Sequence, residues 1–192
     1  GMGFAIGGLQ KLGYLNLEGM DADVGQVKRA VQRNLPVSLV SIEDCAAYMA
    51  ARTRACDVVL AIDVVEHVPV NEQLNLLTLI HGSLKEDGRF ICQVPNANST
   101  LAGRYRYVDW THHASFTEDS LRMALLYAGF RKVEVREADP NHFPYRRLKG
   151  APRWALLTIV RCWRRLEFVA ELGMGHGARV PLTPNIIAIA HK

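Results

Sequence analysis

The sequence predicts an α/β protein built on a doubly wound, mostly parallel sheet. Two observations carry this prediction. Up to about residue 137, short apolar segments of strand length alternate with segments of helical periodicity, the order that is typical of βαβ units. Within that alternation, segment 57–63 (DVVLAID) is almost wholly apolar, which predicts a strand buried on both faces of a parallel sheet.

Each element follows from a local signal. A helix over 4–13 ends at Gly13, because glycine is common just after helix C-termini, and a helix over 23–33 starts after the N-cap residue Asp23. Further helices are predicted over 45–52, 71–85 and 120–130. Strands are predicted over 15–21, 37–42, 57–63, 88–96, 131–138 and 183–192. Because ligands bind beyond the carboxyl ends of the strands in such a sheet, the loops that follow each strand are the places to search for a site.

The composition excludes several classes of protein. The chain has 192 residues, of which 49% are hydrophobic and 22% charged, so it is neither disordered nor collagen-like. Its four cysteines are scattered and form no CxxC pair, so we expect neither a disulfide framework nor a bound metal. No apolar run reaches the roughly 18 residues that span a bilayer, and no signal peptide is visible. We therefore expect a cytoplasmic protein.

The net charge of +4 is unevenly distributed. Residues 1–139 hold 14 basic and 17 acidic side chains, whereas residues 140–192 hold 9 basic and 2 acidic ones. Segment 140–152 is rich in proline and basic residues and is interpreted as a flap. An amphipathic helix is predicted over 153–173, with its apolar face and its arginines on opposite sides. The apolar face comprises Leu156, Ile159, Val160, Trp163, Leu166 and Ala170, and the basic side comprises Arg153, Arg161, Arg164 and Arg165.

Three partners suit this helix. Its apolar face can cover the core or a second copy of the chain in a homodimer. Residues 153–172 can instead lie in a membrane interface as a peripheral contact, because an apolar face opposite arginines is typical of interfacial helices. A nucleic-acid partner is the least favoured of the three.

The glycines at the start of the chain form the first candidate site. Gly1-x-Gly3 leads into a helix, and glycines that precede a helix let a ligand approach the backbone. Asp21 ends the next predicted strand, where a carboxylate can accept hydrogen bonds from two ribose hydroxyls. The alternative is a flexible start with Asp21 as an ordinary residue at a strand end.

Ionisable residues follow the predicted strand 57–63. Asp63, Glu66 and His67 lie within five residues at the edge where a ligand is expected. The next strand ends in Pro95-Asn96, which shapes a neighbouring loop. The bland alternative is that Asp63 caps a turn while Glu66 and His67 are merely exposed.

A third group of polar residues lies within 104–121 (RYRYVDWTHHASFTEDSL). It contains Arg104, Arg106, Asp109, His112 and His113, and it precedes Thr117, a predicted helix N-cap. The alternative is a structural lid whose polar groups satisfy the backbone.

Together, these motifs resemble the class I S-adenosylmethionine-dependent methyltransferases. The resemblance covers about residues 1–139 and rests on the order of the glycine loop, GMD, DVVLAIDVVEHV, LKEDGRFICQVPN, DWTHHASFT and AGF. It is closest to small bacterial members with an Asp-x-x-Glu-His motif. The family's first strand and the acid before its glycine loop have no counterpart in this sequence.

The resemblance implies a Rossmann-like, seven-stranded sheet with an antiparallel last strand, and S-adenosylmethionine as cofactor. Residues 1–139 are then the cofactor-binding core, and residues 140–192 complete the same domain. The residues implied in cofactor binding are Gly1, Gly3, Asp21, Ala22, Ile42, Glu43, Asp44, Asp63 and Glu66.

A hydroxyl acceptor of the methyl group must lose its proton to a base. His112 is the first candidate because Asp-x-Thr-His recurs in the resembling enzymes, followed by His67 and His113, with Asp109 able to orient an imidazole. The motif of enzymes that methylate nucleic-acid amino groups is absent at 62–65 (IDVV), and no cysteine follows Pro95 as a cytosine C5 enzyme would require. We therefore expect O-methylation of a small-molecule or sugar- or lipid-linked acceptor rather than of DNA or RNA.

Two rival functions fit part of the sequence. In a nicotinamide-dependent oxidoreductase, Gly1-x-Gly3-x-x-x-Gly7 and Asp21 would bind the dinucleotide. The pair Tyr145-x-x-x-Lys149 even imitates short-chain dehydrogenases, but it lies beside prolines instead of on a helix, and motif 63–67 has no role there. The other rival is a catalytically impaired methyltransferase-like module for binding or dimerisation.

Overall fold

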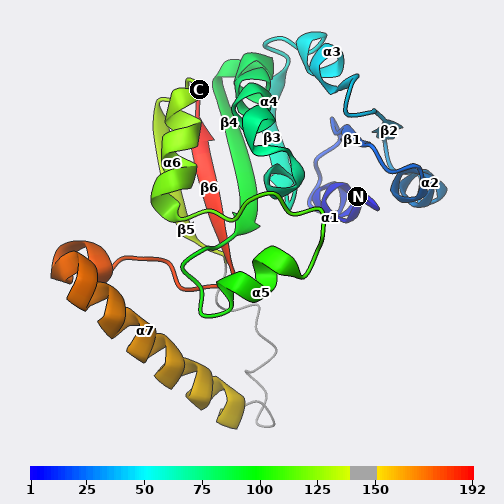
Figure 1. The fold of residues 1–192 in the computed structure, drawn as a ribbon. Coiled ribbons are helices and arrows are strands. Elements are labelled where there is room, and N and C mark those ends of the chain that lie inside the picture. The colour runs from blue at the N-terminus through cyan, green and yellow to red at the C-terminus, as the bar shows by residue number, and fades with distance from the viewer. Residues whose placement is uncertain (139–150) are drawn as a thin grey trace. The chain divides into compact units, whose positions relative to one another are not determined.

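The computed structural model describes residues 1–138 and 151–192 (Figure 1). The chain divides into two compact units, Gly1–Arg52 and Thr53–Lys192. Of the predicted flap at 140–152, residues 140–150, including Tyr145 and Lys149, lie outside the described residues, whereas 151–152 begin a helix. The boundary predicted at residue 139 stays a prediction.

The first unit holds a pair of parallel strands and three helices. The elements are α1 (Phe4–Lys11), β1 (Gly19–Asp21), α2 (Val24–Gln32), β2 (Val37–Leu39) and α3 (Cys45–Ala50). The Asp23 side chain caps α2 by accepting a hydrogen bond from the Gln26 backbone N at 2.7 Å, as predicted. Gly13, just after α1, has a φ of +92°, which explains why α1 ends there. The alternation of elements matches the sequence prediction, although both strands are shorter than expected.

The second unit is built on a four-stranded sheet in the order β3-β4-β6-β5. Its strands are β3 (Cys56–Ile62), β4 (Leu84–Pro95), β5 (Lys132–Glu137) and β6 (Asn185–His191). Strands β3 and β4 pair in parallel, whereas β6 runs antiparallel to both β4 and β5. The last strand therefore lies inside the sheet, and the predicted α/β class with an antiparallel last strand is confirmed.

Helices connect the strands of this unit. They are the 3₁₀ helix η1 (Val65–His67), α4 (Val70–Ser83), α5 (Ala102–Tyr107), α6 (Glu118–Tyr127) and α7 (Ala151–Gly177). Figure 1 shows α4 and α6 side by side against the sheet, and they contact β4, β5 and β6. The core between them contains Leu77, Phe90, Leu121, Leu125 and Ile186, all fully buried.

Two expectations about the sheet differ from the structure. The prediction that 57–63 is buried on both faces is wrong, because β3 forms the edge of the four-stranded sheet and its side chains Val58, Leu60 and Ile62 are 39–49% exposed. The described residues also contain six strands in two sheets, instead of the single seven-stranded sheet that the resemblance implies. Apolar composition identified the strand, but strand order decided its burial.

Helix α7 is the predicted amphipathic helix. It is interrupted at Gly173, whose φ of +79° lies outside helical geometry, and this is where the sequence predicts its end. The apolar side chains Leu156, Ile159, Trp163 and Leu166 are 62–67% exposed, so they do not pack into the core. Among the helices of the described residues, none combines the length and apolar character that crossing a bilayer requires.

Candidate functional site

Asp63 follows the carboxyl end of β3 in an unusual backbone conformation. Its φ is +53°, a left-handed geometry that few residues other than glycine adopt. The Asp63 backbone N donates to the Gln93 carbonyl at 3.1 Å, and the Gln93 amide donates to the Asp63 side chain at 3.1 Å. These two bonds to β4 hold Asp63 where the sequence places it, at the edge of the sheet where ligands bind.

Glu66, in the 3₁₀ helix that follows, is fully buried. Among the described residues, no other residue hydrogen-bonds either of its carboxylate oxygens. Burial raises the pKa of the Glu66 carboxyl to about 7, and the charge of Asp63 acts in the same direction. The η1 turn itself is fixed by Gln73, whose amide donates to the carbonyls of Val65 and Val68 at 3.2 and 3.0 Å. A buried carboxylate without partners is rare and calls for a functional explanation.

Two imidazoles from distant segments meet beside Glu66. The rings of His67 and His112 lie edge to face, with centroids 4.7 Å apart. One potential ligand atom each of Glu66, His67 and His112 lies within 4.8 Å of the others. The sequence nominated all three residues, and the fold brings them together.

The hydrogen bonds of these rings determine their tautomers. His112 Nδ1 lies 2.9 Å from the Tyr105 carbonyl oxygen, which can only accept, so this nitrogen carries the proton. His67 Nδ1 lies 2.7 Å from Thr111 Oγ1. That hydroxyl donates its only hydrogen to Asp109 Oδ1 at 2.7 Å, so His67 Nδ1 must donate to it. In its neutral form, each ring therefore keeps an unprotonated Nε2 with a free lone pair.

Asp109 acts on His67 through Thr111 and not directly. Its carboxylate accepts the Thr111 backbone N at 2.8 Å as well as the hydroxyl. These hydrogen bonds from Thr111 lower the pKa of Asp109, with smaller contributions from His67 and His112. The sequence analysis missed Thr111, although its place between Asp109 and His112 was a usable signal.

His113 and Arg106 hold the loop in place by backbone contacts. The His113 backbone N donates to the Glu66 carbonyl at 2.7 Å. The Arg106 guanidinium donates to the carbonyl oxygens of His112 and His113. These bonds connect the loop before α6 to η1, and they bring His112 to the Glu66 carboxylate.

Asn96 follows the end of β4 and ties this strand end to the segment that leads into β6. Its buried side-chain amide donates to the carbonyls of Pro181 and Thr183 at 2.9 and 2.8 Å, and its Oδ1 accepts from the Asn98 backbone N. The sequence predicted a loop-shaping role for Pro95-Asn96. The structure adds the partners, which lie in the segment leading into β6.

The remaining candidates lie in the first unit, where the glycine loop meets β1. Gly3 precedes α1 with a φ of +76°, and no side chain caps the first turn of that helix. The free backbone N–H groups of the first turn of α1 therefore suit an anionic group such as a carboxylate. The Asp21 carboxylate contacts the Gly1 amino group and accepts the Asp23 backbone N at 2.8 Å. Gly1 and Asp21 are thus in contact, and the role of Gly1, Gly3 and Asp21 in cofactor binding stays a prediction.

The candidates after β2 are more loosely held. Ile42 is 78% exposed, and the Ser41 hydroxyl donates to Asp44 at 2.9 Å. Because Asp21 pairs with Leu39 in register, the carboxyl ends of β1 and β2 align, and Ala22 and 42–44 follow these two ends. The donors and acceptors of this unit fit S-adenosylmethionine: amide hydrogens for its carboxylate and Asp21 for its ribose hydroxyls.

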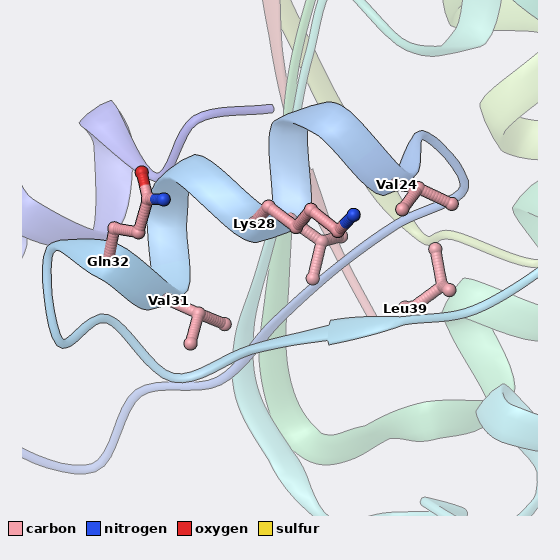
Figure 2. Close-up of a pocket in the computed structure, with 6 residues that line it drawn as sticks. Val24, Lys28, Val31, Gln32 and Leu39 are labelled. Atoms are coloured by element: carbon pink, nitrogen blue, oxygen red, sulfur yellow. The ribbon is translucent and has the colours of Figure 1, made fainter.

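A pocket of about 370 Å³ lies elsewhere in the first unit (Figure 2). Figure 2 shows side chains that line it, from α2 (Val24, Lys28, Val31 and Gln32) and from β2 (Leu39). Its lining is apolar and includes none of the candidate site residues, so we do not place the site there.

Comparisons with known proteins agree with these observations. Residues 4–135 match the family model described as a methyltransferase domain. No curated protein matches the chain. Similar solved structures include a SAM-dependent methyltransferase from Archaeoglobus fulgidus, which has a TM-score of 0.70 and 20% identity and is matched over 100% of this chain and 82% of its own.

Two other similar structures are larger proteins. A putative O-methyltransferase from Nostoc punctiforme has a TM-score of 0.59 and 15% identity, with 98% of this chain and 48% of that chain covered. Phosphoethanolamine N-methyltransferase 2 of Haemonchus contortus, solved in complex with S-adenosyl-L-methionine, has a TM-score of 0.63 and 18% identity, with 100% and 46% covered. With the family model matching well over half of its residues, the chain belongs to the methyltransferase domain family and is a class I S-adenosylmethionine-dependent methyltransferase.

Proposed function

We propose that this methyltransferase transfers the methyl group to a hydroxyl oxygen, on a small-molecule or sugar- or lipid-linked acceptor. The observation that carries the proposal is the pair of free Nε2 lone pairs on His67 and His112. When bound, S-adenosylmethionine supplies an electrophilic methyl group. A hydroxyl is a poor nucleophile until it is deprotonated, whereas a neutral amine already has a lone pair to attack with. Because the Nε2 atoms of His67 and His112 can accept the proton of a hydroxyl, this cluster favours O-methylation.

The residues of the chain have separate tasks in this proposal. Gly1, Gly3 and Asp21, with Ala22 and 42–44, contact the cofactor. His67 and His112 receive the acceptor hydroxyl, and Thr111 orients the His67 ring. The reaction then depends on aligning the acceptor oxygen with the methyl group, which is chiefly positioning.

Exposed aromatic side chains near the histidines support an acceptor with a sugar ring or lipid chain attached to its hydroxyl. Trp110 is fully exposed between Asp109 and Thr111, and Tyr107, the last residue of α5, is 79% exposed. Exposed aromatic rings next to a polar cluster are typical of sites that bind a ring or chain through its apolar face. This supports a sugar- or lipid-linked acceptor.

The test is a transfer assay with methyl-labelled S-adenosylmethionine and a panel of sugar alcohols and lipid-linked sugars. Because general base catalysis contributes about 100-fold or more, His112→Ala should reduce methyl transfer by at least that factor while leaving cofactor binding intact. His176→Ala is the matched control, because His176 is an exposed histidine that pairs with Asp119 at 3.4 Å. A product in which NMR places the methyl group on nitrogen would overturn the proposal.

A second proposal concerns α7, which we assign to a peripheral contact with an anionic membrane surface. Four large apolar side chains on one face of α7 are exposed, and residues 151–192 carry six Lys and Arg against two Glu. An exposed apolar face on a basic helix suits the interface of anionic lipids. Such a location would bring the site to a lipid-linked acceptor.

Co-sedimentation with vesicles tests this second proposal. Binding to anionic vesicles should exceed binding to neutral ones, and it should fall in the double variant Ile159→Asp with Leu166→Asp. Met123→Asp changes another exposed apolar side chain, on α6, and should have no effect. If the chain ignores vesicles and elutes as a dimer that the double variant dissociates, then a second copy covers the helix and the membrane proposal fails.

A further inference from the structure

We infer that Glu66, His67 and His112 form a binding site for a divalent transition-metal ion such as Zn²⁺. Three groups of ligand type converge: one potential ligand atom from each residue lies within 4.8 Å of the others. Two imidazoles and one carboxylate form a ligand set that Zn²⁺ and Fe²⁺ use in catalytic sites, where further positions stay open for water or substrate. The sequence analysis expected no metal, because the four cysteines are scattered and form no CxxC pair.

The strongest observation is the state of Glu66. Its side chain is fully buried, and no other described residue donates a hydrogen bond to either carboxylate oxygen. Burying a charged or polar group without a partner is costly, and a bound cation removes that cost by supplying the missing charge. The two oxygens without partners are those of Glu66, which lies beside the imidazoles of His67 and His112.

The hydrogen bonds of both histidines provide a second, independent observation. Metal-binding histidines typically donate their other ring N–H to a carbonyl, a carboxylate or a polar side chain, which fixes the tautomer and the orientation of the ring. His112 Nδ1 donates to the Tyr105 carbonyl, and His67 Nδ1 donates to Thr111, which Asp109 orients. Both Nε2 atoms are left with free lone pairs, as metal ligands require.

The role of the ion, unlike its binding, rests on the proposed function. A divalent cation lowers the pKa of a bound hydroxyl, so an acceptor hydroxyl that coordinates it loses its proton to solvent more readily. In the metal-bound state His67 and His112 act as ligands, and the oxygen that attacks the methyl group is the one the ion holds. The ion would therefore promote deprotonation of the acceptor hydroxyl, the step for which this cluster is proposed.

The experiment is calorimetric titration of the metal-stripped 192-residue chain with Zn²⁺, without cofactor or acceptor, and with Mg²⁺ in parallel. We expect one Zn²⁺ per chain, bound more tightly than Mg²⁺. Glu66→Gln keeps the size of the side chain and should weaken Zn²⁺ binding about 100-fold, as should His112→Ala. Circular dichroism checks that each variant is folded. If His112→Ala does not fold, the titration of Glu66→Gln by itself tests the site.

His176→Ala is the control, because Glu118, Asp119 and His176 form the other group of potential ligands among the described residues, and its last two members are exposed. Zn²⁺ binding should survive this substitution. Absence of stoichiometric binding, or binding that disappears in His176→Ala but persists in Glu66→Gln, would overturn the inference. Either result leaves the transfer assay free to support O-methylation by a metal-free route, so the two proposals fail separately.

Discussion

The hydroxyl of Thr111 connects Asp109 to the ring of His67: it donates to the Asp109 carboxylate and accepts the His67 Nδ1 proton, both at 2.7 Å. These two hydrogen bonds orient the His67 ring, one of the two imidazoles beside Glu66. They also decide which nitrogen of His67 is free for chemistry.

Thr111→Val should disconnect Asp109 from His67 while keeping the shape of the side chain. Loss of such an orienting partner typically costs about 10- to 100-fold in metal affinity or activity. We expect a loss of this size in Zn²⁺ affinity, measured by calorimetry, and in methyl transfer. Thr111→Ser keeps the hydroxyl and should restore both properties, so equal behaviour of the two variants would contradict the role given to the hydroxyl.

Asp21→Asn should weaken the binding of S-adenosylmethionine and S-adenosylhomocysteine. A hydrogen bond to a charged acceptor contributes about 1.5–3 kcal/mol, so we expect about a 10- to 100-fold loss in affinity by calorimetry. Glu18→Gln serves as the control, because Glu18 lies in the same unit and bonds to Arg52 on the surface. A variant of Asp21 with undiminished affinity would show that the ribose contact lies elsewhere.

Asn96→Ala should destabilise the second unit. The substitution removes a buried side chain and leaves the carbonyls of Pro181 and Thr183 without a donor. Unsatisfied buried groups cost about 1–3 kcal/mol each, so the free energy of unfolding should fall by about 2–6 kcal/mol in urea denaturation. Asn75→Ala, an exposed change on α4, should leave it nearly unchanged.

The stability of the chain should depend on His81 below neutral pH. Burial lowers the pKa of His81, and the charges of Lys192 and Arg131 add to this effect while Glu86 opposes it. The folded state thus prefers the neutral ring, and this contribution is complete above the unfolded pKa of about 6.5 and is lost as the pH falls through the lower, folded value. Urea denaturation between about pH 7 and pH 5 should therefore show a shallower loss of stability in His81→Asn than in the parent chain. Identical slopes would contradict this assignment.

The cysteines should differ sharply in their reactivity with thiol reagents. Burial raises the pKa of Cys92 to about 12, whereas Cys162 on α7 is exposed. In the native protein at about pH 8, a disulfide-exchange reagent should label Cys162 rapidly and Cys92 only after unfolding. Mass spectrometry of the labelled peptides distinguishes the two, and Cys162→Ser should remove the rapid phase.

Local sequence signals were sufficient for most elements. The N-caps Asp23 and Thr117 and the breaks at Gly13 and Gly173 lie where the sequence predicts them, because capping depends on residues that are neighbours in the chain. The burial of β3 could not be predicted in this way. An edge strand can have the same apolar sequence as a central strand, and then only the strand order distinguishes them.

The sequence by itself determined the α/β class, the resemblance to methyltransferases and the nomination of Glu66, His67 and His112. It did so because residue types that follow strand ends are readable from a single segment. Only the tertiary structure decided that His67 and His112 share one cluster with a buried, unpartnered Glu66, and that Thr111 joins Asp109 to it. Distances between residues far apart in the chain, and the burial that makes an unpaired carboxylate costly, arise only when the strands and loops have packed.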